Sequence, residues 1–227
     1  MKTIIVTDIH GCLKQLEKLF AQTAFDPKTD RLICLGDLMD RGPASFGVFS
    51  RFRGLKAQMG ERCILILGNH EDMMIHSFTD EVVHARWMRN QGQTTLDSFA
   101  EHGCDLRAEL PWFDQMKPYA ELEQFICVHA GLVHNVPEEN TLHDLIWDRA
   151  MANGAPYGGK LVIFGHTETN KVTYRDAANE THFLLPGTDY PLPETGCINM
   201  DTGCVYGGKL SALVTDGKTL RVYEALA

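Results

Sequence analysis

The sequence lacks any apolar stretch of the roughly 18 residues that a membrane span needs. The apolar run near the start ends at Asp8 and is too short for a signal peptide. The seven cysteines are odd in number and include no C-x-x-C pair, so we expect reduced residues in a core. Basic charge is scarce: the net charge of −9 argues against nonspecific binding to nucleic acid or to anionic membranes. These absences predict a cytoplasmic protein.

The sequence also lacks internal repeats and low-complexity segments. Its 227 residues are 44% hydrophobic and 22% charged, an ordinary globular composition that is long enough for a substantial core. We therefore expect residues 1–227 to form a single domain.

Five short apolar runs each end abruptly in polar residues. They are residues 4–6, 32–35, 63–67, 125–128 and 161–164, and they are followed by Asp8, Asp37, Asn69, His129 and His166. In open α/β sheets, ligands bind outside the carboxyl ends of strands. The pattern therefore predicts a functional site where the five strand ends converge.

Helical spacing of apolar residues predicts a helix after Gly11 and a mostly helical segment from residue 71 to about 116, with Trp87 among its inward positions. Pro43 suits the first turn of another helix. Residues 168–196 indicate an irregular excursion. Three further apolar runs, residues 197–200, 210–214 and 220–223, predict an antiparallel meander that closes a second sheet, with a hairpin turn at residues 216–217.

Asp8 and His10 are two residues apart in an extended stretch, so both side chains can reach one cation. A carboxylate with neutral imidazoles suits manganese, iron or zinc better than calcium. The alternative is a strand end with a capping aspartate, and this short stretch alone does not decide between them.

Asp37 directly follows a predicted strand, and Asp40 and Arg41 lie three and four residues further on. Gly36 and Gly42 flank the loop and permit a close approach of the backbone. The alternative is a surface salt bridge between Arg41 and the acids. The buried strand and the two glycines favour a site.

Neighbouring side chains diverge in an extended chain, so Asn69 can face a metal while His70 faces the substrate. On this division Asn69 is an oxygen ligand and His70 is an unmetallated acid. Asp40 would hold His70 in the required tautomer and raise its pKa, because a nearby carboxylate favours the charged imidazole.

Taken singly, His129 and His166 are more typical of satisfied core or loop histidines than of metal ligands. With Asp8, His10, Asp37 and Asn69 they complete six candidate ligands, enough for two metals that share Asp37. Two such ions about 3.5 to 4 Å apart can activate a water and bind both ends of an in-line phosphoryl displacement.

The five loops resemble, in order, the signature of the phosphoprotein phosphatase (PPP) family of calcineurin-like metallophosphoesterases. The matching motifs are residues 8–11, 36–42, 68–71, 129–131 and 165–167. Chain length, residues 146–149 (Ile-Trp-Asp-Arg) and residues 201–203 (Asp-Thr-Gly) extend the resemblance to the small serine/threonine phosphatases of bacteriophage lambda and of bacteria.

The resemblance implies two divalent metal ions, with Mn²⁺ expected first and iron, zinc, nickel or magnesium as alternatives. The first metal would be held by Asp8, His10 and Asp37, and the second by Asp37, Asn69, His129 and His166. It also implies a four-layer α/β sandwich, in which two mixed β-sheets are flanked by helices.

The resemblance further implies that His70 protonates the leaving oxygen with support from Asp40. Arg41 and Arg149 would grip the phosphate oxygens, a task that suits a planar guanidinium. For Arg149 the alternative is a surface ion pair at a helix end, and Asp201 is expected to be structural. Arg86, Trp87, Asn90 and Gly92 also resemble a stretch of the bacterial members, but no mechanism suggests itself for them.

We therefore predict a phosphatase that hydrolyses phosphomonoesters on Ser, Thr or Tyr side chains of a protein or peptide, by attack of a metal-bridging hydroxide. One alternative is a symmetrical diadenosine tetraphosphate hydrolase, or another hydrolase of nucleotide polyphosphates. Those enzymes usually depart from the Asp40 and Glu71 motifs seen in this chain. A metal-free protein-binding scaffold is the other alternative, but such a module should have lost ligands, and all six remain.

Overall fold

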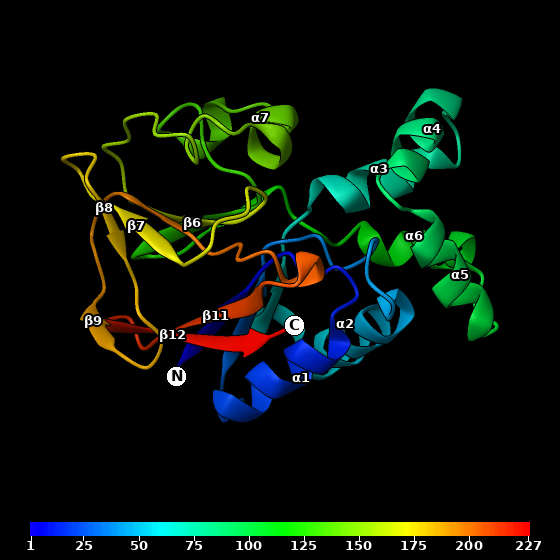
Figure 1. Cartoon of the computed structure of the whole chain (residues 1–227), viewed down its shortest axis with the longest axis horizontal. Helices are drawn as coiled ribbons and strands as arrows, with labels where there is room; N and C mark the ends of the chain where they lie inside the picture. Colours follow the sequence, from blue (N-terminus) through cyan, green and yellow to red (C-terminus); the bar gives the residue numbers. More distant parts are fainter.

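The computed structural model describes residues 1–227 and contains two six-stranded mixed sheets (Figure 1). The first sheet has the order β3 (Cys63–Leu65), β2 (Arg31–Cys34), β1 (Thr3–Val6), β11 (Lys209–Thr215), β12 (Thr219–Leu226) and β9 (Asp189–Pro191). The second has the order β4 (Tyr119–Glu121), β5 (Phe125–Val128), β6 (Leu161–Phe164), β10 (Cys197–Asn199), β7 (Thr173–Arg175) and β8 (Thr181–Phe183).

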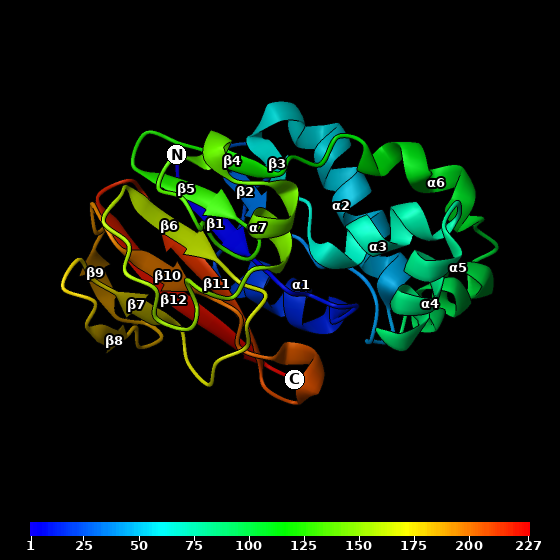
Figure 2. The same ribbon diagram turned by 90° about the horizontal axis from the view of Figure 1, so that it is seen from above.

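Helices cover the outer faces of both sheets (Figures 1 and 2). The first sheet is covered by α1 (Leu13–Gln22) and α2 (Ser45–Met59), and the second by α7 (Leu142–Trp147). Beside the sandwich stands a helical cap, which consists of α3 (Asn69–Ser77), α4 (Glu81–Arg89), α5 (Gln93–Glu101) and α6 (Leu106–Phe113). Three short 3₁₀ helices are η1 (Gly60–Arg62), η2 (Pro137–Glu139) and η3 (Cys204–Tyr206). None of the helices is both long enough and apolar enough to cross a membrane.

Side-chain alternation along the strands explains the four layers. In β1, Ile4 and Val6 join the core under α1 and α2, whereas Ile5 points into the core between the two sheets. In β5, Phe125 enters this middle core and Ile126 the core under α7. Because successive strand residues point to opposite faces, two sheets buried on both faces create three cores. The predicted four-layer α/β sandwich is confirmed.

The strands that precede the candidate loops run in the same direction within each sheet. Parallel pairing joins β1 to β2 and β2 to β3 in the first sheet, and β5 to β6 in the second. The carboxyl ends of these strands therefore lie along common edges. The predicted convergence of strand ends follows from this topology.

The predicted helix after Gly11 and the predicted helical segment before residue 116 are confirmed. The predicted hairpin at residues 216–217 is confirmed, because β11 and β12 pair antiparallel on either side of it. The prediction that the tail closes a second sheet is wrong, because β10 pairs with β6 in the second sheet while β11 and β12 extend the first sheet beside β1. Residues 168–196 contain three short strands rather than only irregular chain, and α2 begins at Ser45, two residues after Pro43. Local patterning identifies a strand but carries no information on its distant partner.

Candidate metal centre

All six candidate ligands follow strand ends, five of them on loops and Asn69 at the first residue of α3. Several of these loops have unusual backbone conformations. Positive φ angles occur at Asp8, His10, Asp37, Asp40, Arg41 and His166, although none of them is glycine. Such conformations cost about 1 to 3 kcal/mol each and concentrate at functional sites. Gly36 allows the close approach of two of the loops, because a Cβ there would lie 2.5 Å from the backbone nitrogen of Gly68. The fold thus holds strained loops together at one place.

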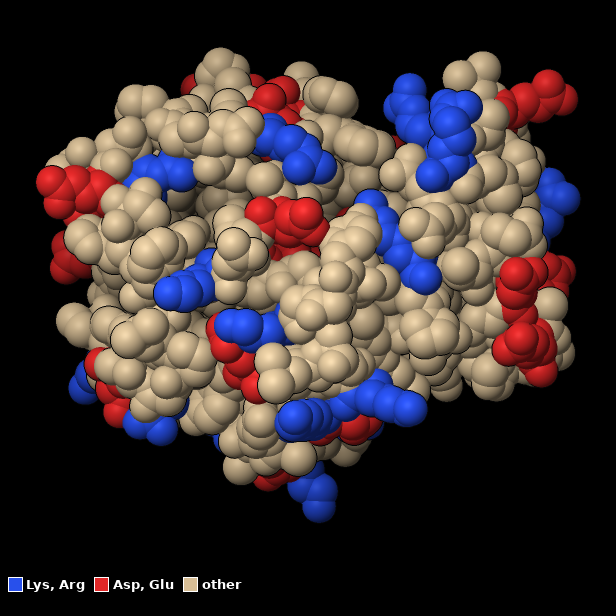
Figure 3. Space-filling model, in the orientation of Figure 1, with Lys and Arg blue, Asp and Glu red and all other residues tan.

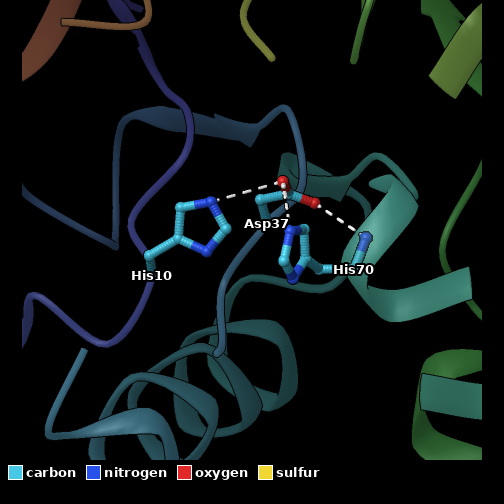
Figure 4. A group of neighbouring side chains, drawn as sticks. All are labelled: His10, Asp37 and His70. Carbon is cyan, nitrogen blue, oxygen red and sulfur yellow. Dashed lines mark hydrogen bonds and ion pairs between the residues drawn. The ribbon is translucent and has the colours of Figure 1, made fainter. Parts of the chain in front are cut away.

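The Asp37 carboxylate lies at the centre of the converging loops (Figure 4). Its Oδ2 atom is 3.4 Å from His10 Nε2, 3.5 Å from His129 Nε2 and 4.0 Å from His70 Nε2. A cation about 2.1 Å from each of two ligand atoms holds them about 3.0 to 3.4 Å apart at octahedral or tetrahedral angles. The spacing around Asp37 is therefore close to that of a bridging carboxylate between two ions.

Two of the histidines are oriented by backbone carbonyl groups. His10 Nδ1 is 2.7 Å from the Met39 oxygen, and His129 Nδ1 is 2.8 Å from the Leu35 oxygen. A carbonyl only accepts, so each Nδ1 donates its proton and each Nε2 turns toward Asp37. Metal-binding histidines are commonly oriented in this way. Their chemistry fits the role of ligands.

Asn69 lies between the two histidines that follow strands of the second sheet. Asn69 Oδ1 is 2.9 Å from His129 Nε2 and 3.0 Å from His166 Nδ1. Asp37, His129 and His166 have ligand atoms within 4.8 Å of one another, and so do His10, Asp37 and His70. Asp8 is outside both groups, and its Oδ2 accepts hydrogen bonds from Thr7 Oγ1 and the His166 backbone N–H.

The buried carboxylates of the cluster repel one another, so a bound cation would stabilise their charged forms. Burial and the nearby Asp37 raise the pKa of Asp8 to about 6, and burial and Asp8 raise the pKa of Asp201 to about 8. Burial alone would lower the pKa of His10, but its contact with Asp37 outweighs this effect and raises the pKa to about 9. Burial and the charge of His129 lower the pKa of His166 to about 3, which favours a neutral imidazole. Buried acids beside imidazole side chains fit a binuclear site for divalent metal ions.

His70 and Asp40 form a buried pair beside this centre. His70 Nδ1 donates to Asp40 Oδ2 at 2.7 Å, while His70 Nε2 is buried without a partner and faces Asp37. Burial lowers the pKa of His70 by more than Asp37 and Asp40 raise it, so the net pKa is below its usual value. The predicted effect of Asp40 is therefore present, but it does not decide the net direction.

The two candidate arginines differ in their surroundings. Arg41 Nη1 lies 2.6 Å from His10 Nε2, and its guanidinium lies over the Tyr206 ring, 5.4 Å from the centroid. Binding of a cation by that nitrogen of His10 therefore requires the Arg41 guanidinium to move aside. Arg149 is exposed and lies near enough to His166 for its charge to help lower the pKa of that imidazole. Their predicted contact with phosphate stays a prediction.

Sequence reasoning gave Glu71 no role in building the site. This fully buried side chain accepts hydrogen bonds from the backbone N–H groups of Asp37 and Leu38, both at 2.8 Å, and of Gly68 at 3.2 Å. It therefore ties the loop of Asp37 to the start of α3. The sequence signal was the glutamate two residues after Asn69, a first-turn position where carboxylates bind free backbone N–H groups.

Trp87 and Thr95 were also not assigned to the site, although both hydrogen-bond to Asp40. The resemblance of residues 86–92 to the bacterial members was the available signal for Trp87. Nothing in the sequence marked Thr95, because its contact with Asp40 spans 55 residues of chain.

The chain is similar in sequence to a bacterial protein phosphatase and to tetraphosphatases. Serine/threonine-protein phosphatase 1 of Salmonella typhimurium is 28% identical over 219 residues, which are 91% of this chain and 88% of that protein. The symmetrical bis(5'-nucleosyl)-tetraphosphatase of Vibrio cholerae is 33% identical over 83% of this chain. The chain spans between 44% and 63% of the length of the matched tetraphosphatases.

A metallophosphoesterase structure from Sphaerobacter thermophilus has the same fold, with a TM-score of 0.67 at 19% identity. The match covers 99% of this chain and 88% of that one. The family model for calcineurin-like phosphoesterases matches residues 1–192. Because this match includes well over half of the chain and all six candidate ligands, the protein belongs to the calcineurin-like phosphoesterase family.

Proposed function

We propose that this metallophosphoesterase is a phosphoprotein phosphatase that hydrolyses phosphomonoesters on Ser, Thr or Tyr side chains. The supporting observation is the His70–Asp40 pair, in which Nδ1 is held at 2.7 Å and Nε2 is left without a partner beside Asp37. An ester of serine leaves as a strongly basic alkoxide, which needs a proton in the transition state. The pair provides a positioned donor for that proton.

The same observation separates the two candidate substrate classes by their leaving groups. Hydrolysis of a dinucleoside polyphosphate releases a nucleotide whose phosphate is weakly basic and leaves with little help from an acid. Esters of Ser and Thr gain most from a buried acid. The oriented His70 therefore favours phosphomonoesters over phosphoanhydrides.

In the proposed mechanism, Asp8, His10 and Asp37 would hold one divalent ion, and Asp37, Asn69, His129 and His166 would hold the second. When bound, these ions would supply Lewis-acid polarisation of the phosphate and an activated water. His70 Nε2 donates its proton to the leaving oxygen, while Asp40 keeps the ring oriented through Nδ1. The negative phosphate beside Nε2 favours the protonated imidazole and opposes the effect of burial.

Arg41 and Arg149 orient the substrate in this proposal by hydrogen bonds to the phosphate oxygens. The face viewed in Figure 3 carries separate lysine and arginine groups with acidic side chains between them. This face has no continuous basic patch of the kind that binds nucleic acid (Figure 3).

The proposal predicts that His70→Asn keeps the bound metal and lowers kcat on a phosphoserine peptide by about 10² to 10⁴-fold, the usual contribution of an acid catalyst. Metal content and steady-state kinetics of the Mn²⁺-loaded variant would be measured together. Unchanged kcat in a metal-replete variant would remove His70 from the mechanism.

A symmetrical tetraphosphatase is the second candidate, because the Vibrio cholerae relative is 33% identical over 83% of the chain. Turnover of phosphoserine, phosphothreonine and phosphotyrosine peptides would be compared with that of diadenosine tetraphosphate, with Mn²⁺ present. We expect the higher kcat/KM for a phosphopeptide. A clear preference for the dinucleotide would overturn the proposed function.

A further inference from the structure

We propose that Trp87 and Thr95 are positioning residues, which fix the Asp40 carboxylate and through it the direction in which His70 presents Nε2. This inference deepens the proposed function and rests on it for its catalytic consequence. Its structural part concerns hydrogen bonds among side chains of this chain and can be tested without turnover.

Both oxygens of the Asp40 carboxylate are occupied by donors from the helical cap. Oδ2 accepts from the Trp87 indole at 2.8 Å as well as from His70, and Oδ1 accepts from Thr95 Oγ1 at 2.5 Å. The Thr95 hydroxyl also accepts the Asp40 backbone N–H at 2.9 Å. Three helices, α3, α4 and α5, thus each direct one side chain at a single carboxylate.

The indole of Trp87 is fully buried, and its N–H has no hydrogen-bond acceptor other than Asp40. A buried indole N–H without a partner is costly, so this bond fixes the orientation of the ring as well as that of the carboxylate. Gly92 leaves room for the ring, because a Cβ at that position would lie 2.4 Å from an indole carbon. The fit explains why tryptophan and glycine occur together in this stretch.

Orientation matters because Asp40 sits on a loop with a strained backbone, at φ 68°. With His70 as its only donor, the carboxylate could rotate about its Cβ–Cγ bond and carry the imidazole with it. Donors on both oxygens remove this freedom. The loss of an outer hydrogen-bond partner commonly costs about 10 to 100-fold in the activity of a metal site.

The loss of kcat in variants of Trp87 and Thr95 should depend on the leaving group of the ester. A general loss of stability would lower kcat equally for all esters. We expect Trp87→Phe and Thr95→Val to lower kcat for phenyl phosphate by about 10-fold or more. For 4-nitrophenyl phosphate, whose leaving group needs little protonation, the loss should be several times smaller. KM for both esters should change little, because neither residue is assigned a contact with substrate.

Two matched variants control for packing. Trp112→Phe removes an indole from α6 in the same cap, where the ring packs on Phe49 and makes no hydrogen bond to the site. Thr95→Ser keeps the hydroxyl that Thr95→Val removes. Both controls should retain the wild-type ratio of kcat for the two esters, measured on the Mn²⁺-loaded protein.

Proton NMR of the metal-free protein supplies a readout that does not depend on catalysis. The His70 Nδ1–H and Trp87 Nε1–H signals should lie downfield through their bonds to Asp40. Trp87→Phe and Thr95→Val should shift or broaden the His70 signal, while Trp112→Phe and Thr95→Ser should leave it unchanged.

An unchanged His70 signal in both Trp87→Phe and Thr95→Val would overturn the inference, as would equal losses of kcat on the two esters. If the wild type hydrolyses neither aryl ester but the signals respond as expected, the proposed function fails while the positioning network stands.

Discussion

Asp201 illustrates how single residues respond to the buried charge of the centre. It is 7% exposed, and burial together with Asp8 raises its pKa to about 8 from an ordinary value of 3.8. An acid whose pKa is higher in the folded state lowers the free energy of unfolding as pH rises between the two values. The metal-free protein should therefore lose stability from about pH 4 to pH 8.

Four other residues of the centre also set the pH range over which the stability of the metal-free protein changes. Asp8, with a pKa of about 6, acts in the same direction at the acid end of the range, and so does Glu71, whose pKa is raised to about 7 by burial and Asp37. His10 also acts in this direction, because its stabilising proton is lost as pH rises toward 9. His166 acts oppositely, because its depressed pKa of about 3 costs stability as pH falls below about 6.5. Because the three acids together outweigh His166 above pH 4, the metal-free chain should be most stable near pH 4 and lose stability as pH rises from there.

Asp201→Asn should raise the free energy of unfolding of the metal-free protein at pH 8 by on the order of 1 kcal/mol. The amide removes the buried negative charge and keeps an oxygen for the Gly203 N–H, which donates to Asp201 Oδ1 at 3.0 Å. The gain should fade toward pH 4. Urea unfolding in a chelator at both pH values would measure it, with the exposed Glu123→Gln as a control. A variant no more stable than wild type at pH 8 would contradict the assigned charge.

At the scale of elements, the helical cap acts as a support for the acid pair. The sequence predicts its helices and the inward position of Trp87, because apolar spacing reports which side of a helix is buried. It does not predict that the buried indole ends on Asp40, since this contact joins residues 47 apart. The positive φ angles of the loop residues were equally out of reach, because most of these side chains rarely adopt them.

A pair of glycine substitutions tests the role of the cap. Gly92→Ala places a Cβ against the Trp87 ring and should lower both stability and kcat. Gly54→Ala, in the middle of α2 with no atom within 4 Å of the added Cβ, should instead stabilise the protein by about 0.5 to 1 kcal/mol. Thermal unfolding and phenyl phosphate kinetics would be recorded for both. Normal activity in Gly92→Ala would show that the ring needs no such space.

At the scale of the whole molecule, the candidate centre connects the two sheets. Asp8, Asp37 and Asn69 follow strands of the first sheet, while His129 and His166 follow strands of the second. The sequence predicted this convergence because parallel strands place their carboxyl ends on one edge. It could not assign β11 and β12 to the first sheet, because strand partners are chosen by packing over the whole chain.

The central claim is that the six residues bind two divalent ions that share Asp37. Anomalous diffraction from crystals of the Mn²⁺-loaded protein tests it most directly. The account predicts two peaks about 3.5 to 4 Å apart, one on each side of Asp37 Oδ2. A single peak, or metal only at the surface group of Asp176, Glu180 and His182, would contradict it.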